Sequence, residues 1–224
     1  MRKLTLFLLV FTAMLYSNAQ TAYTDSIKQL LQNEKADTSR VLHLAVLSYE
    51  YHESKPDTSM MLALEAYSLA NRIGFLKGIA SSLNRLGGTF EVLGNYPKAM
   101  DCFLQALKIN EKINNPDGKQ SNLNNIGLIY ADQEDYRQAL PYYFNSKSLA
   151  EQLSNKRSMA IVCGNLAEAY YFLNQFDSAR QYAQQSYDTA SKIGYSRIIG
   201  SSLNRLGTIH LALGHNAVAA EYYR

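Results

Sequence analysis

The heptapeptide Ser-Ser-Leu-Asn-Arg-Leu-Gly at residues 81–87 returns unchanged at residues 201–207. Related segments lie between the two copies, at residues 123–127 and 163–167, so that equivalent positions fall at 83, 123, 163 and 203. A fixed period of this length is the signature of a repeat array, in which each repeat is one small structural unit. The sequence therefore predicts repeats that begin near residues 40, 80, 120, 160 and 200.

Each repeat carries the pattern of two helices. In the second repeat, a buried stripe with the helical spacing i, i+3, i+4 and i+7 is formed by Leu83, Leu86, Gly87 and Phe90. Gly94 and Asn95 then supply a stop and a cap, and Pro97 suits the first turn of a second helix. We therefore predict an all-α protein, an α-solenoid of antiparallel helix pairs.

Small residues occur at two kinds of position that need a physical reason. The turns between repeats are regular, since an apolar residue is followed in turn by Gly74, Asn114, Ser154 and Gly194, and Gly and Asn suit a left-handed helix cap. Within a helix, glycine costs about 0.5–1 kcal/mol relative to alanine, so Gly87, Gly127 and Gly207 indicate close approach of the paired helix. On this basis, Gly127→Leu should overpack the pair by about 1–3 kcal/mol.

The two ends of the chain differ from the regular repeats. Residues 1–19 combine a positive start, an apolar stretch and a small-x-small site, which predicts a signal peptide and a mature protein in the periplasm or on the surface of a bacterium. Residues 20–39 should form an N-terminal helix, followed by the repeat array over residues 40–224. Its repeats are a degenerate one at 40–79, regular ones at 80–119, 120–159 and 160–199, and an incomplete one at 200–224. We expect the natural protein to continue beyond Arg224.

Composition excludes several classes of function. Apolar residues make up 47% of the chain and charged residues 18%, and part of the formal net charge of +3 lies in the signal, so neither nucleic acid nor an anionic membrane is an indicated partner. No later segment is apolar enough to span a membrane. The two cysteines, Cys102 and Cys163, lie on different predicted helices, so we expect two buried thiols and no disulfide.

The sequence contains no enzyme motif. It has no nucleophile elbow, phosphate loop, HExxH helix or dinucleotide fingerprint. His210 and His215 are five positions apart across a predicted helix end, a spacing that we expect to keep the two imidazoles off a common face. The sequence therefore predicts a non-enzymatic protein with no cofactor and no metal site.

Polar side chains recur beside the buried stripe of the first helices, toward the edge that lines the concave face of a solenoid. This polar row consists of Asn84, Arg85, Asn124, Asn125, Asn165, Asn204 and Arg205. A row of Asn amides can hold the backbone of an extended peptide, and Arg can grip a carboxylate. In the alternative interpretation, these side chains bond neighbouring loops or only solvate the groove. Acidic residues nearby, Glu91, Asp132 and Glu168, leave the charge of the ligand open.

The order of a large apolar residue, Leu-Gly, Tyr, then Ala, an aromatic residue and Ala resembles the tetratricopeptide repeat family. The common period of that family is shorter, at about 34 residues, so this chain resembles its 40-residue variants, which have longer helices. The resemblance implies a superhelix that binds a protein or peptide. In peptide-binding members, an Asn commonly contacts the ligand backbone at the position of Asn125 and Asn165, which Arg85 and Arg205 occupy in the second and fifth repeats.

A narrower resemblance leaves two functions open. Residues 37–41, 56–57 and 125–130 are similar to exported bacterial arrays attached to sensor histidine kinases or helix-turn-helix regulators. The first function is an exported module that binds an extended segment on its concave face. The alternative is the sensory or dimerising extracytoplasmic region of a transmembrane kinase or regulator whose output domain lies beyond residue 224. An open C-terminal end would also permit a homodimer.

Overall fold

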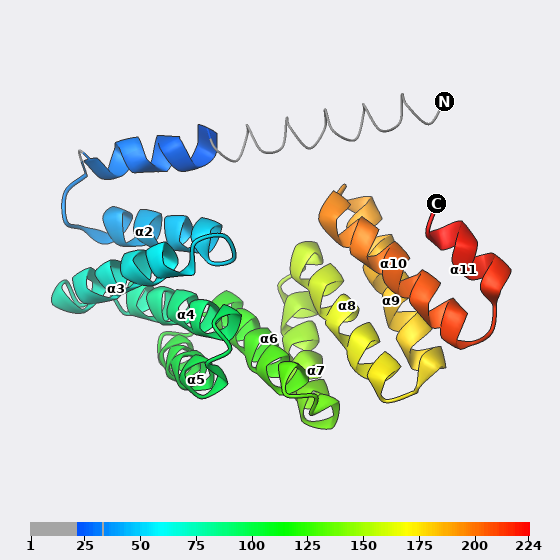
Figure 1. The fold of residues 1–224 in the computed structure, drawn as a ribbon. Helices are drawn as coiled ribbons and strands as arrows, with labels where there is room; N and C mark the ends of the chain where they lie inside the picture. Colours follow the sequence, from blue (N-terminus) through cyan, green and yellow to red (C-terminus); the bar gives the residue numbers. More distant parts are fainter. Residues whose placement is uncertain (1–21, 33) are drawn as a thin grey trace. The chain divides into compact units, whose positions relative to one another are not determined.

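The computed structural model describes residues 22–32 and 34–224 (Figure 1). The signal peptide predicted for residues 1–19 lies outside the described residues. The chain divides into two compact parts, an N-terminal part that ends at Leu93 and a C-terminal part, Gly94–Arg224.

Both parts consist of helices, and residues 22–32 and 34–224 contain no strand. The N-terminal part has a helix over residues 22–32, then α2 (Thr38–Tyr51), α3 (Pro56–Arg72) and α4 (Leu76–Val92). The C-terminal part has α5 (Tyr96–Lys112), α6 (Pro116–Asp132), α7 (Tyr136–Gln152), α8 (Lys156–Phe172), α9 (Phe176–Lys192), α10 (Ser196–Ala212) and α11 (Asn216–Tyr222). Within each part, consecutive helices pack against each other (Figure 1). The predicted α-solenoid of helix pairs is confirmed.

A constant helix length explains the 40-residue period. Each helix from α3 to α10 has 17 residues, and three residues join it to the next helix. The repeated heptapeptide lies inside α4 and α10, so the first helices begin at residues 76, 116, 156 and 196, four residues before the predicted starts of the repeats. The last helix, α11, has seven residues.

Each three-residue turn contains a residue in the left-handed region. Positive φ angles occur at all four predicted caps, which are Gly74, Asn114, Ser154 and Gly194. The same conformation occurs in the turns within repeats, with φ of 62° at Glu134 and 58° at Asn174. The backbone N–H of Asn115 donates to the carbonyl of Asn110 at 2.9 Å, and the Asn115 side chain accepts from the N–H of Gly118 at 3.4 Å. One short turn therefore ends one helix and caps the next.

Close helix packing is the reason for the glycines at Gly127 and Gly207. A Cβ atom added at Gly127 on α6 would lie 2.6 Å from Cε1 of Tyr143 on α7, and one added at Gly207 on α10 would lie 2.7 Å from Cε1 of Tyr223. Tyr143 is only 1% exposed. The glycine on the first helix therefore provides the space for an aromatic ring from the second.

The repeats that lack this glycine also lack the ring. Leu47 stands at the position of Gly127, and the position of Tyr143 is then Ala63, which is fully buried. In the repeat after Gly127, the same two positions are Ala167 and Ala183, which belong to one core cluster. Relative to Gly127 and Tyr143, the pair of Leu47 and Ala63 thus exchanges side-chain volume between its two helices, whereas the two alanines together carry less volume. The first repeat, which looks degenerate in sequence, therefore has about the same side-chain volume at these two positions, distributed differently between its helices.

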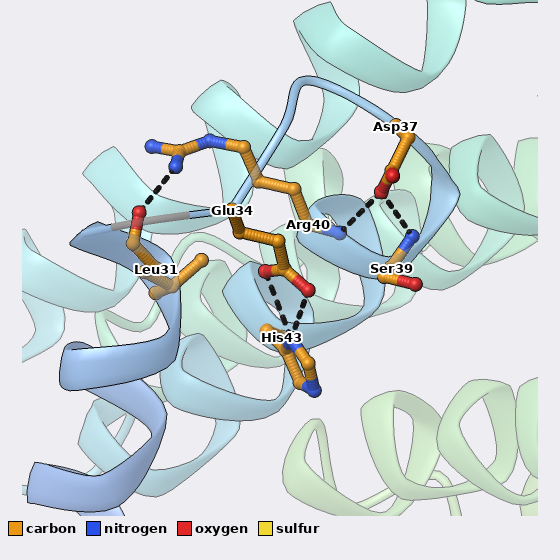
Figure 2. Close-up of polar contacts among 6 residues, drawn as sticks. All are labelled: Leu31, Glu34, Asp37, Ser39, Arg40 and His43. Atoms are coloured by element: carbon orange, nitrogen blue, oxygen red, sulfur yellow. Dashed lines mark hydrogen bonds and ion pairs between the residues drawn. The ribbon is translucent and has the colours of Figure 1, made fainter.

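Polar contacts attach the helix over residues 22–32 to α2 (Figure 2). Nη1 of Arg40 donates to the carbonyl of Leu31 at 2.6 Å, and Nδ1 of His43 lies 2.9 Å from the Glu34 carboxylate. The Asp37 side chain caps α2 by accepting from the N–H of Arg40 at 3.3 Å. His43, which replaces a large apolar residue of the repeat, therefore serves this contact.

The cysteines are as expected from the sequence. Cys102 and Cys163 are both buried free thiols, and burial raises the pKa of each to about 11. None of the described helices is long and apolar enough to cross a bilayer.

Candidate binding face

The helices of the C-terminal part form two layers. The first helices of successive repeats contact each other directly, α6 with α8 and α8 with α10 (Figure 1). The odd-numbered helices lie farther apart, and α7 and α9 meet through side chains, with the ring centroids of Phe144 and Tyr182 6.1 Å apart. The even-numbered helices therefore form the closer layer, which carries five residues of the polar row: Asn124, Asn125, Asn165, Asn204 and Arg205.

Three residues of the polar row are joined by hydrogen bonds. Nδ2 of Asn165 on α8 donates to Oδ1 of Asn124 on α6 at 2.9 Å. Nδ2 of Asn124 in turn donates to Oδ1 of Asn125 at 3.4 Å. Asn124 is only 8% exposed, whereas Asn125 and Asn165 are half-buried. The structure thus links two neighbouring helices through a short chain of amides.

The last helix pair places Arg205 against the preceding first helix. Its guanidinium on α10 forms an ion pair with Glu168 on α8. A Cβ added at Gly164 would lie 3.1 Å from Nη1 of Arg205, so the absence of a side chain there makes room for the arginine. Asn204 is exposed on α10, and its backbone carbonyl accepts from Thr208. Arg205 is therefore engaged within the chain.

The N-terminal part uses its arginine in a similar way. Cζ of Arg85 on α4 lies 4.9 Å from the ring centroid of Tyr49 on α2, which is a cation–π contact. Burial lowers the pKa of the Arg85 guanidinium. Asn84 is half-buried next to it on α4. The period assigns these residues to equivalent positions of the repeat, but the sequence could not show the ring that Arg85 covers.

A cleft of about 310 Å³ lies beside the amide chain, between α6 and α8. It is lined by Leu128, Ala131, Asp132, Glu134, Tyr136, Tyr143, Asn165, Glu168, Ala169 and Phe172. Phe172 is 51% exposed and stacks on Tyr136, with ring centroids 4.7 Å apart and planes 11° apart. Asn165, Asp132 and Glu168 were identified from the sequence, whereas Glu134 and the two stacked rings were missed.

The cleft is negative. Burial and the nearby Glu168 raise the pKa of Asp132, and burial together with the surrounding carboxylates raises the pKa of Tyr136. Among the described residues, no cation forms an ion pair with Asp132 or Glu134. The cleft therefore favours a ligand group with a positive charge.

A second, larger groove of about 910 Å³ runs along α9. It is lined mainly by polar side chains of that helix, together with Leu206, His210 and Tyr222. None of the polar row lines it. The smaller cleft is therefore the better candidate for a binding site on the even-numbered layer.

The expectation that His210 and His215 stay apart is wrong. Their Nδ1 atoms lie 3.3 Å apart, because the left-handed turn between them reverses the chain. His210 also stacks on Tyr222 at a centroid distance of 5.5 Å, as Tyr170 stacks on Tyr182 one repeat earlier. Helical spacing alone does not apply across a turn. In the described residues, no three His, Cys, Asp or Glu side chains are grouped to hold a metal ion.

Comparison with known proteins identifies the family. The profile of the tetratricopeptide repeat matches residues 78–143 and 118–192. The chain belongs to the tetratricopeptide repeat family. Tetratricopeptide repeat proteins are generally non-enzymatic scaffolds, and membership supports a role as a protein–protein interaction module. The search of curated proteins found no match.

Solved structures share the fold of this tetratricopeptide protein at low sequence identity. A Rap protein complexed with competence and sporulation factor has a TM-score of 0.76 and 14% identity, over 95% of this chain and 71% of that chain. BtubC (BKLC) from P. vanneervenii has a TM-score of 0.70 and 18% identity, over 92% and 85% of the two chains. PilF from Pseudomonas aeruginosa has a TM-score of 0.59 and 20% identity, over 92% and 89%. At these identities the likeness shows the fold alone.

Proposed function

We propose that the protein is an exported, non-enzymatic module that binds an extended protein segment along its even-numbered helices. The observation that carries the proposal is the amide chain of Asn165, Asn124 and Asn125, which crosses from α8 to α6 beside an open cleft. The segment would lie across α6, α8 and α10, on the face that the layer of first helices forms. Export rests on the predicted signal peptide.

Asn165 keeps hydrogen-bonding capacity for a ligand. A primary amide has two N–H donors and an acceptor oxygen, and Asn165 uses one donor on Asn124. Its second donor and its oxygen can therefore serve a peptide N–H and carbonyl. The internal bond also fixes the orientation of the side chain, which lowers the entropy lost on binding.

The similarity in fold to a Rap protein supports this proposal. That protein was solved in complex with competence and sporulation factor, so a fold of this kind accommodates a bound factor. In the present chain, Arg205 and Arg85 contact Glu168 and Tyr49 respectively. We therefore assign the primary ligand contacts to the amides. The arginines instead stabilise the packing of adjacent helices.

A random-sequence peptide library displayed on phage provides the test, because no ligand has to be assumed. Peptides selected on the native chain should bind the Asn125→Ala/Asn165→Ala variant roughly thirtyfold more weakly, since each of the two lost hydrogen bonds contributes about 1 kcal/mol. Asn145→Ala removes an exposed amide from α7, in the other layer, and should leave the affinity unchanged. Equal affinity of the native chain and the double variant, at unchanged helical content, would remove the amide chain from the binding site.

A further inference from the structure

One position of the repeat carries arginine in some repeats and asparagine in others. In successive repeats it is occupied by Arg85, Asn125, Asn165 and Arg205. In the two cases with arginine, the guanidinium reaches back to the preceding first helix: Arg85 covers a tyrosine of α2, and Arg205 pairs with Glu168 of α8. The chain therefore fills the interval between α2 and α4, and that between α8 and α10, with its own cation.

The interval between α6 and α8 lacks such a cation. Asn165 is too short to extend along α6 and bonds to Asn124, which stands where Gly164 gives room to Arg205 one repeat later. The space beyond Asn165 is the cleft of about 310 Å³. Of its three acidic residues, Glu168 pairs with Arg205, whereas Asp132 and Glu134 have no ion-pair partner among the described residues.

The stacked rings add a surface suited to a planar cation. Tyr136 covers one face of Phe172, and Tyr171 meets its edge at a centroid distance of 5.4 Å and an angle of 79°. Because the side chain is still 51% exposed, its remaining face is open to solvent. A guanidinium binds well on such a face, and carboxylates at its rim can accept its N–H groups.

We propose that the cleft between α6 and α8 binds an arginine side chain of the partner segment, with the guanidinium over Phe172 and its N–H groups on Asp132 and Glu134. The partner then supplies the cation that Arg205 supplies in the next interval. This assignment rests on the proposed binding of a segment along the even-numbered helices, and it names the residue that the segment must carry. Arginine fits better than lysine because the site combines a flat aromatic face with two separate acceptors.

A small probe isolates this site from the rest of the segment. N-acetyl-arginine methylamide should bind the isotope-labelled chain with a dissociation constant on the order of 10 mM, and it should shift the backbone amide signals of residues around Asp132, Glu134 and Phe172. The citrulline analogue has nearly the same shape without the charge and should bind at least about tenfold more weakly. Equal binding of the two probes, shifts confined to other residues, or no shifts would overturn the assignment.

Transplanting the neighbouring pair provides a second, independent test. Asn124→Gly/Asn165→Arg reproduces the Gly164 and Arg205 pair in the interval between α6 and α8, so the chain should fill its own cleft and lose the arginine probe. Asn124→Gly alone is the matched control and should still bind the arginine probe. Asp132→Asn/Glu134→Gln should weaken the probe at least about tenfold at unchanged helical content. Undiminished binding by the transplanted or the neutralised variant would contradict the proposal.

The outcome for the cleft can be separated from the outcome for the proposed function. Library peptides that bind through the amide chain without enrichment in arginine would support segment binding and overturn the arginine site. If the chain binds the arginine probe but selects no library peptide, the arginine site would be supported and segment binding would be overturned. If the selected peptides are enriched in arginine, and this enrichment disappears when the selection is made on Asp132→Asn/Glu134→Gln, both segment binding and the arginine site would be supported.

Discussion

Replacing Gly127 by leucine tests the packing that determines the distance between α6 and α7. The first added atom, Cβ, would lie 2.6 Å from Cε1 and 2.7 Å from Cδ1 of Tyr143. Carbon atoms in contact are normally about 3.5–4.0 Å apart, so the ring would have to move by about 1 Å. Tyr143 is only 1% exposed and packs in a buried core cluster with Ala139 and Val162, so a shift of its ring disturbs the core. We therefore expect a loss of about 3 kcal/mol, at the upper end of the usual cost of overpacking.

A compensating change should recover most of this loss. Tyr143→Ala alone should cost about 3–5 kcal/mol, because it opens a large cavity. Gly127→Leu/Tyr143→Ala reproduces the combination of Leu47 and Ala63 in the N-terminal part, where both residues are buried. The leucine would then fill the space that the ring leaves. We expect the double variant to be more stable than the sum of the single changes predicts, by at least about 2 kcal/mol.

Urea unfolding followed by far-UV circular dichroism measures these free energies. A loss of about 3 kcal/mol should also lower the midpoint of thermal unfolding by about 6–12 °C for a chain of this size. Gly200→Leu is the matched control, because a Cβ at that helical glycine meets no atom within 4 Å. It should stabilise the chain slightly, by the higher helix propensity of leucine. An unchanged stability of Gly127→Leu, or strict additivity in the double variant, would refute the proposed exchange of volume between helices.

Three other properties can be tested directly. Burial and the neighbouring His215 lower the pKa of His210 in the folded chain. The contribution of this histidine to stability should therefore be complete above its unfolded pKa of about 6.5 and should be lost as the pH falls from there through the lower folded pKa. Urea titrations at several pH values should show this loss, and His210→Tyr should reduce it. The pKa of about 11 for Cys102 and Cys163 predicts slow reaction with a thiol reagent near pH 8 in the folded chain and rapid reaction in urea, so rapid reaction of the folded chain would contradict their burial. Expression in a Gram-negative host should give an exported chain cleaved after Ala19, and N-terminal sequencing of the periplasmic fraction would reveal retention of the leader instead.

The fold could be predicted from the sequence because the repeat states the same information several times. A stripe at helical spacing, a cap after it and a small residue within it recur from one repeat to the next, so an error at one copy is corrected by the others. The left-handed conformation of Glu134 was not predictable from its residue type, which carries a Cβ and does not favour positive φ. It is required by the three-residue turn, whose length is constant, so the period and not the local propensity determines it.

The candidate site was only partly predictable, because the period places residues on a helix but does not show what they reach. The position of Asn124, Asn125 and Asn165 on one layer follows from the repeat, and the structure adds the bonds among them. Phe172 and Tyr136 could not be paired in this way, since their stacking depends on a ring from a helix end and one from the start of the previous helix. Contacts between helix ends that lie far apart in the sequence, such as this one, need the packing of the helices before they can be inferred.

Departures from the repeat distinguish the site from the scaffold. In the core of the first repeat, the change on one helix is balanced on its partner, since Leu47 is matched by Ala63. The change from arginine to asparagine at Asn165 has no such balance, because it leaves an open cleft and two carboxylates without a cation among the described residues. A chain selected for stability alone gains by filling that space, as Arg205 does one repeat later. The unbalanced departure is therefore where binding to a partner has the strongest physical reason to occur.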